Sequence, residues 1–492
     1  MPPFRKQKAT RHVARKKNPD RSGKEQVDMV RIADPVYGTL ELTILESRIA
    51  STPAFDRLRR VKQLGLANYV YPGADYSRYS HCIGVCHLTG RLLTELRKNG
   101  AVIPDAAIPL YRVAGLLHDV GHYPLSHVTE RAIKQYFTSL LIYSKHAGPA
   151  PSPPRTSVME HEQVGKNIIE RDTEISGLLK DHGIDPALVT GIIRRERTPY
   201  LRSNVISSDL DADRIDYLLR TAHHTGLPYG SSDLNYLLTQ IRLDSDGLFC
   251  VMPNAMRTIE HFLLGRYFDY QQVAFHPRVA GLELVLEECI KRLHAEKLLD
   301  LSASAISAMV GTPQWRTFDD AFLLNTISSG RNRSRSNVTK ALADAVIAGR
   351  APRLVFSTEE FNPNSNVQKT HYSEKRRLEG IISELVTEFG ISSDYWWVWD
   401  KPSQSITKIG SLVSTAEAGS LATRDRFDQL ARILPLRGGD GRSKPIVEFE
   451  GSLIRVLSNY ALFSLRLYVL LPDRANDLGE KIKMGVAAKM LK

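Results

Sequence analysis

Four short segments rich in His and Asp constrain this chain more than any other feature, because each lies in a stretch with helical periodicity. They are RYSHCIG (78–84), LLHDVGHYPLSH (116–127), MEHEQ (159–163) and SSDLDADRIDYLLR (207–220). Apolar residues around them recur every three or four positions, which indicates helices packed around a shared core. A helical bundle builds a metal site by bringing imidazoles and carboxylates inward from separate helices. The pattern predicts a mainly α fold with a divalent-cation site in its core.

The composition along the chain predicts three parts. We expect a basic disordered tail at 1–28, a helical domain at 29–300 and a C-terminal α/β lobe at 301–492, because 492 residues exceed one ordinary core. The lobe is predicted from short segments rich in β-branched and aromatic residues, among them PRLVFST, SDYWWVWD and LRLYVLL. The run SSGRNRSRSN (328–337) reads as an exposed loop, and the Pro- and Ser-rich stretch 146–157 as a surface insertion of unassigned role.

Charge and cysteine content limit the classes of protein. The formal net charge is +12, and residues 1–24 hold nine Lys or Arg against one Asp. Such a tail could bind nucleic acid, although a solvated arm is the simpler interpretation. No apolar run is long enough to span a bilayer, the basic N-terminus lacks the apolar stretch of a secretory signal, and four cysteines make no disulfide framework. We therefore expect a cytoplasmic protein without a membrane partner.

The segment 116–127 carries the strongest chemical signal. His118 and Asp119 end an apolar helix, where an unpaired charge would be costly and a metal ion would explain both side chains. His122 and His127 follow at once, so several imidazoles crowd one place. Any one of these histidines could be an ordinary hydrogen-bonded core residue. Four such segments together favour a hydrolytic metal site instead.

The segment 207–220 alternates Asp with apolar residues. Asp209, Asp213 and Asp216 share a face at helical spacing. An acidic helix face is usually only solvated, but this one lies among leucines and isoleucine. At least one Asp is therefore predicted to point inward, either as a ligand or as a residue that orients one.

The ordered set H…HD…D, with LLHDVGHYPLSH and DADRIDYLLRTAHHTG, resembles the HD-domain phosphohydrolases, and more narrowly the branch of the SAM- and HD-domain dNTP triphosphohydrolase. The segments DPVYGTLELT, TPAFDRLRRVKQLGLANYVYPGADYSRYSH and GRYFDYQQVAFHPRV also resemble that branch, so the likeness runs from about residue 32 to 291. It implies an HD phosphohydrolase domain at 29–300 and the following roles. The metal ligands would be His81, His118, Asp119 and Asp213. The acid/base set would be His122, His127, His161 and Glu130, with Glu130 orienting a histidine. The substrate contacts would be Gln63, Arg78, Arg214, Tyr217, Arg266 and Tyr270, the three arginines being suited to phosphate oxygens by their planar donor fork.

Three positions depart from the family pattern. Thr221 replaces an aspartate near the sugar, Ala274 replaces a tyrosine beside it, and Ser51 replaces an aspartate that reads an allosteric guanine. The first two loosen the expectation of strict deoxynucleotide selection. The third argues against the same activation by a guanine nucleotide.

Two other groups of residues are predicted to be structural. Cys82, Cys86 and His87 have part of a zinc-site spacing but lack a second Cys pair, so the cysteines are interpreted as core residues. The tryptophans at 396, 397 and 399 could stack on bases, yet they alternate on an expected strand. We expect them to pack against the helical domain.

The leading prediction is an enzyme of nucleotide metabolism that hydrolyses dNTPs to deoxynucleoside and tripolyphosphate. One alternative is an HD phosphohydrolase acting on another nucleotide, either a ribonucleotide or a signalling nucleotide. Another is a nucleic-acid-binding protein that works through its basic tail. His and Asp ligands suit Mg, Mn, Fe, Zn or Ni. Family likeness further implies a homo-oligomer.

Overall fold

The computed structural model describes residues 29–146, 158–196, 199–201, 205–206, 210–230, 233–363, 367–404, 435–439, 441–472 and 476–490. The basic tail at 1–28, nearly all of the 146–157 insertion and Asp209 lie outside these residues. None of the helices in the described ranges combines the length and apolar character needed to cross a membrane.

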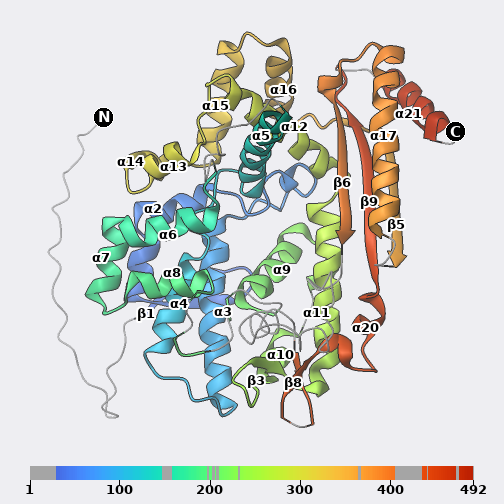
Figure 1. Ribbon diagram of the computed structural model, residues 1–492. Helices are drawn as coiled ribbons and strands as arrows, with labels where there is room; N and C mark the ends of the chain where they lie inside the picture. The colour runs from blue at the N-terminus through green and yellow to red at the C-terminus, as the bar shows by residue number, and fades with distance from the viewer. Residues whose placement is uncertain are drawn as a thin grey trace, which may run out of the picture.

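A β-hairpin and a set of helices form the N-terminal half (Figure 1). Strands β1 (Met29–Asp34) and β2 (Gly38–Thr43) pair antiparallel, and Thr43 with Glu46 forms a capping box that starts the next helix. The helices of this half share one large apolar core. They are α1 (Ile44–Ala50), α2 (Pro53–Asp56), α3 (Arg78–Lys98), α4 (Ala107–Leu117), α5 (His127–His146), α6 (His161–Arg171), α7 (Thr173–Asp181), α8 (Pro186–Ile193), α9 (Ala212–Thr225) and α10 (Leu234–Thr239).

Helix α3 is the central element of this body. It packs against both α4 and α9, and most of its residues are buried. Asn99 caps its end and Gly100 follows with φ +92°, a backbone conformation that favours glycine, so the helix ends where the sequence predicts. Because α3, α4 and α9 carry three of the four His- and Asp-rich segments, their packing brings these segments together.

The middle of the chain continues the same core. Helices α11 (Met256–Asp269) and α12 (Pro277–Ala295) are joined by a π-helical turn, η5 (Tyr270–Ala274). The following helices pack onto the body through buried residues such as Trp315, Phe318 and Leu342. They are α13 (Ala303–Met309), α14 (Pro313–Thr317), α15 (Asp320–Arg333) and α16 (Asn337–Ile347). The division of the chain near residue 300 remains a prediction.

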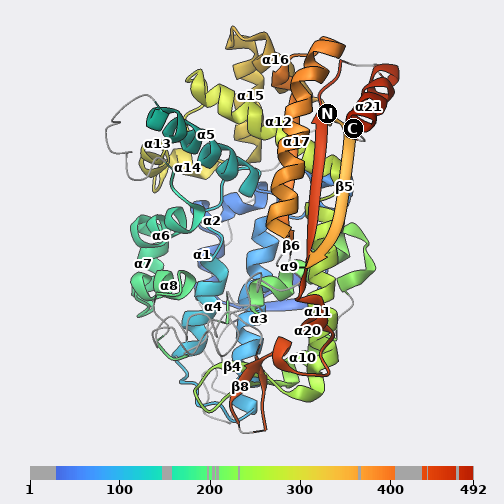
Figure 2. The same cartoon turned by 45° about the vertical axis from the view of Figure 1, so that its right-hand side comes forward.

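A three-stranded antiparallel sheet dominates the C-terminal part, at the orange and red side of Figures 1 and 2. Its order is β5–β9–β6, with the long β9 in the middle. One face is covered by α17 and α21, and the other contacts α12. The elements of this part are β5 (Arg353–Pro363), α17 (Val367–Phe389), β6 (Trp396–Gln404), α20 (Leu453–Leu457), β9 (Tyr460–Val469) and α21 (Asn476–Met490). A small second sheet joins two strands from the middle of the chain to two later ones, in the order β3 (Ile241–Leu243), β4 (Phe249–Val251), β7 (Pro435–Arg437) and β8 (Ser443–Pro445).

The predicted fold class, mainly α with a smaller mixed lobe, is confirmed. The four cysteines are buried and free, as expected for core residues. Trp397 and Trp399 do face the helical body, whereas Trp396 points to the other side of β6 and packs among residues of α17 and α21.

The segment 328–337, predicted as an exposed loop, is largely exposed, but it is a loop only at 334–336. Helix α15 continues to Arg333, and its Gly330 lies so close to Leu293 of α12 that a Cβ there would come within 2.6 Å of a leucine methyl. Tertiary packing of α15 on α12 therefore overrides the weak helix preference of a Ser-, Gly- and Arg-rich sequence.

Candidate metal centre and active site

Two His and two Asp side chains from three separate elements meet inside the helical body. His81 lies on α3, His118 and Asp119 directly follow α4, and Asp213 lies in the first turn of α9. Nε2 of His81 is 3.1 Å from Asp213 and 3.8 Å from Asp119. Nε2 of His118 is 3.4 Å from Asp119 and 3.8 Å from Asp213. Two imidazole nitrogens and two carboxylates thus face one small space.

The hydrogen bonds of the two imidazoles are those expected of metal ligands. Nδ1 of His118 is 2.8 Å from the carbonyl oxygen of Gly115, and Nδ1 of His81 is 2.8 Å from Asp216. Because each Nδ1 faces an acceptor, it carries the ring proton and leaves Nε2 with a lone pair. Both Nε2 atoms are buried without a hydrogen bond to any described residue. Ligands about 2.1 Å from one ion lie about 3.0–3.4 Å apart, close to the separations found here.

The electrostatics of this centre also call for a positive charge. Burial raises the pKa of Asp119, but His118, Arg78 and His122 outweigh it and hold that pKa well below its ordinary value. Burial lowers the pKa of His81, yet the carboxylates of Asp213 and Asp216 raise it to about 9. The carboxylates therefore stay ionised, and a proton or a cation at this position is favoured.

Asp216 and Arg220 support His81 from behind, and neither belongs to the predicted site. Asp216 is fully buried and accepts from His81 and from Nε and a terminal nitrogen of Arg220, both at 3.0 Å. Arg220 also donates to Asp34 at the end of β1, at 2.8 Å. Gly84 of α3 makes room for this contact, since a Cβ there would lie 1.8 Å from a carboxylate oxygen of Asp216. A carboxylate that holds a ligand imidazole by its other nitrogen is typical of metal sites.

The Asp-rich segment separates into different roles in three dimensions. Asp211 caps the N-terminus of α9 by accepting from the backbone nitrogen of Arg214, at 2.6 Å. Asp213 faces the two histidines, and Asp216 faces His81 from the opposite side. The helical spacing placed Asp213 and Asp216 on one face, which was the only sequence signal for Asp216.

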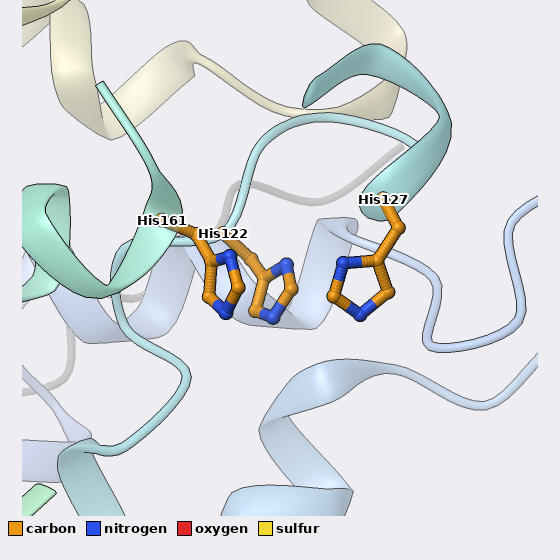
Figure 3. A group of neighbouring side chains, drawn as sticks. All are labelled: His122, His127 and His161. Atoms are coloured by element: carbon orange, nitrogen blue, oxygen red, sulfur yellow. The ribbon is translucent and has the colours of Figure 1, made fainter. Parts of the chain in front are cut away.

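His122, His127 and His161 form a second group of imidazoles (Figure 3). The His122 ring lies between the other two, stacked on His161 with 4.1 Å between centroids and 22° between planes. Nε2 of His122 is 3.2 Å from Asp119, which links the two groups. Nearly parallel rings direct their nitrogens the same way rather than at one common point. This arrangement therefore suits contact with several phosphate oxygens better than shared ligation of one ion.

Glu130 organises this second group. It accepts from Nδ1 of His161 at 2.9 Å and from its backbone nitrogen at 3.1 Å, and it lies 3.8 Å from Nδ1 of His127. These contacts hold the pKa of Glu130 below its ordinary range despite burial, and Glu130 in turn raises the pKa of His161. Burial lowers the pKa of His122 well below normal and also that of His127. The His127 side chain is 62% exposed, so it is the imidazole that a ligand reaches first.

The loop between His122 and His127 is strained and held by distant residues. Leu125 and Ser126 have φ of 51° and 61°, a left-handed conformation that costs non-glycine residues about 1–3 kcal/mol each. Asp320, the first residue of α15, accepts from the backbone nitrogen of Leu125 at 2.7 Å and from that of Lys62 at 3.0 Å. No sequence signal pointed to this contact, because Asp320 lies nearly two hundred residues further along the chain.

Arg57 holds the beginning of the same loop. Its guanidinium is fully buried, donates to the carbonyl oxygens of Val120 and His122 at 3.2 and 2.7 Å, and lies over the Trp315 ring at 4.2 Å. Burial lowers the pKa of Arg57 to about 9. Gly121 is needed here as well, because a Cβ would come within 2.2 Å of backbone atoms of His161 and Gly165.

The predicted substrate contacts fall into two places. Arg78 is buried at the start of α3 and bonds both Asp119 and Ser126, so it touches the metal centre. Gln63 and Tyr270 line a cavity together with His127. The partly buried Tyr217 and the buried Arg266 lie near Tyr270, and the Tyr217 hydroxyl has no hydrogen-bond partner among the described residues. Arg214 is buried next to Asp213 on α9. Their substrate roles remain predictions.

The three family departures lie in different surroundings. Thr221 is buried, with its hydroxyl 2.8 Å from that of Tyr76. Ala274 lines the cavity beside His127. Ser51 is exposed at the end of α1, where its hydroxyl donates to the Ser47 carbonyl oxygen at 2.8 Å.

Comparison with known proteins places these features in a family. The HD domain model matches residues 78–221, which include both imidazole groups. The chain is 28% identical over 370 residues to the uncharacterized protein YwfO of Bacillus subtilis, covering 72% of this chain and 75% of that one. It is 31% identical over 223 residues to the deoxynucleoside triphosphate triphosphohydrolase SAMHD1 of Bos taurus, covering 41% of this chain and 36% of SAMHD1. The chain thus spans about a third of SAMHD1.

Solved structures share the fold. A hypothetical protein from Aquifex aeolicus superposes with a TM-score of 0.65 at 23% identity, covering 93% of this chain and 99% of that one. A phosphohydrolase from Bacteroides thetaiotaomicron superposes with a TM-score of 0.62 at 21% identity, covering 90% and 100%. At these identities the likeness establishes the architecture, including the C-terminal part beyond the HD domain.

Proposed function

Because the chain is an HD-domain phosphohydrolase of the branch that includes SAMHD1, we propose that it hydrolyses dNTPs to deoxynucleoside and tripolyphosphate. The observation that carries the proposal is the pair of lone-pair-bearing Nε2 atoms of His81 and His118, buried without hydrogen bonds against two carboxylates. A buried polar atom without a partner is costly, and a divalent cation removes that cost.

In this proposal His81, His118, Asp119 and Asp213 hold the cation. A divalent cation bound there polarises a phosphate oxygen and lowers the pKa of water. Asp216 keeps His81 oriented, and Arg78 places a positive charge next to Asp119. The identity of the ion, among Mg, Mn, Fe, Zn and Ni, stays open because His and Asp ligands suit all of them.

The second imidazole group moves protons in this proposal. His127 is the exposed member and donates a proton to the leaving sugar oxygen, while Glu130 orients it and His161. The bound triphosphate raises the low pKa of His127 by its negative charge, so that the imidazole is protonated when the substrate is in place. His122 stays neutral between Asp119 and His161 and serves as the partner in acid/base exchange.

The arginines and the cavity hold the substrate. Arg78, Arg214 and Arg266 supply guanidinium groups for the phosphate oxygens, since their planar donors match phosphate geometry. Gln63 and Tyr217 bond the sugar 3'-hydroxyl, and Tyr270 lines the place of the base. The unpartnered Tyr217 hydroxyl supports this assignment, because a ligand hydroxyl would satisfy it.

Product analysis tests the proposal. Metal-defined protein is incubated with the four dNTPs and four NTPs in water enriched in ¹⁸O, and products are separated and weighed by mass spectrometry. Attack of water on the α-phosphorus breaks its bond to the 5'-oxygen, so the label should appear in tripolyphosphate and not in the nucleoside. Asp119→Asn should abolish the reaction, whereas Asp105→Asn, at a fully exposed carboxylate, should not. Release of orthophosphate or a nucleoside monophosphate would refute the triphosphohydrolase assignment.

A second candidate substrate is a ribonucleotide. Ala274 leaves the cavity without a bulky wall beside the sugar, and a wall of that kind is what would exclude a 2'-hydroxyl. The same panel decides between the two candidates. Comparable kcat/KM values for each NTP and its dNTP would favour the broader specificity.

A further inference from the structure

The cavity beside His127 is built by both parts of the chain. It has a volume of about 590 Å³ and reaches from Gln63 and His127 to strand β6, where Trp399 and Lys401 line it. Residues of η5 and α12, and Phe275 between these two elements, also line it. A ligand in this cavity would therefore touch His127 at one end and the C-terminal sheet at the other.

Lys401 is the one lysine of this lining, and it forms no ion pair with a described carboxylate, although Glu283, Glu287 and Asp400 lie near enough to act on its charge. It is half-buried, and no carboxylate among the described residues lies within ion-pair distance of its Nζ. The adjacent Asp400 pairs with Lys375, and Glu283 of the same cavity is bonded to Arg131 at 2.8 Å. Burial, and then the charge of Arg131, lower the pKa of Lys401. An ammonium group without an acceptor among the described residues fits a ligand that brings one.

Flat rings surround this ammonium. Its Nζ lies 5.3 Å from the Phe275 ring centroid and 5.8 Å from that of Trp399. Phe275 also stacks on Tyr270, with 5.6 Å between centroids and 25° between planes. Arg466 of β9 fixes this wall by donating to the Phe275 carbonyl oxygen and lying over the Trp399 ring at 4.4 Å. Aromatic walls with one donor at their edge suit a planar heterocycle with a carbonyl oxygen.

We propose that this part of the cavity binds the nucleobase and that Lys401 donates a hydrogen bond to a carbonyl oxygen on it. Contact with the substituent at purine C6 or pyrimidine C4 would make the enzyme prefer guanine and thymine, which carry an oxygen there, over adenine and cytosine, whose amino group at that position is a donor and would face the ammonium unfavourably. This inference rests on the proposed function, since it assumes that the nucleotide's phosphates lie at the metal centre. Lys401 acts here as a specificity residue supplied by the C-terminal sheet.

The test compares specificity in matched variants. For the unaltered protein we expect kcat/KM for dGTP and dTTP to exceed the values for dATP and dCTP. Lys401→Met should reduce that preference at least about tenfold, the size of one lost charge-assisted hydrogen bond. Lys401→Arg should retain much of it. Lys489→Met, at a lysine of α21 that pairs with Glu384 and does not line the cavity, is the control and should leave the ratios unchanged.

Equilibrium binding of nucleosides separates this inference from the proposed function. Calorimetry with deoxyguanosine and deoxyadenosine should show tighter deoxyguanosine binding that is lost in Lys401→Met. If this holds and no dNTP releases tripolyphosphate, the proposed function fails while the base site stands. Equal binding of the two nucleosides, or an unchanged preference in Lys401→Met with its thermal stability intact, would overturn the inference.

Discussion

Replacing Asp216 with Asn removes a negative charge that a metal-site histidine and a buried arginine share. Asp216, His81 and Arg220 have fully buried side chains, and the carboxylate makes three hydrogen bonds to the other two. Removing one partner of a buried ion pair costs about 3–5 kcal/mol. The amide at position 216 would still offer one oxygen as an acceptor, and Arg220 would still pair with Asp34. We therefore expect the free energy of unfolding to fall by about 3 kcal/mol, the lower end of that range.

The same substitution should weaken metal binding, because the His81 ring loses the carboxylate that fixes its orientation. Loss of such a partner typically costs 10–100-fold in metal affinity, or about 1.4–2.7 kcal/mol. Competition against a chromogenic chelator measures the affinity, and urea unfolding of the metal-free protein measures the stability. Asp34→Asn is the matched control, since it removes a carboxylate from Arg220 but none from His81. Equal metal affinity of Asp216→Asn and Asp34→Asn would refute the reasoning.

Three further predictions concern the surroundings of the site. Asp320→Asn should lower kcat about tenfold to a hundredfold with little change in KM, because it loosens Leu125 and so displaces the catalytic loop; steady-state kinetics measure this, and an unchanged kcat would contradict it. Gly121→Ala should also reduce activity at least about tenfold, since the new methyl group meets backbone of His161; full activity of the folded variant would show that the loop adapts. Burial raises the pKa of Asp269 to about 7, so between about pH 4 and 7 the native state holds a proton on this carboxyl that the unfolded state has lost. The contribution of this side chain to stability is therefore full below about pH 4 and is lost as pH rises through 7. Asp269→Asn should remove that loss, so its stability relative to the unaltered protein should be higher at pH 8 than at pH 5 by a few kcal/mol in urea unfolding, and a pH-independent difference would contradict the assignment.

The sequence by itself determined the mainly helical architecture and pointed to a His- and Asp-rich centre. Helical periodicity around the four His- and Asp-rich segments indicated helices packed around a shared core, because the apolar side of a helix has to be buried. The set His81, His118, Asp119 and Asp213 was implied by the family resemblance. The strands β5, β6 and β9 were also predictable, since their β-branched and aromatic residues suit a half-buried sheet.

Only the tertiary structure decided which side chains support and shape the site. Asp211, Asp213 and Asp216 look alike in the sequence, and the position of α9 relative to α3 makes them a helix cap, a candidate ligand and a support for His81. Asp320 reaches Leu125, and Lys401 reaches the cavity beside His127, only because long chain segments return to the helical body. Local sequence patterns carry no information about such contacts, since the folding of the intervening chain brings the partners together.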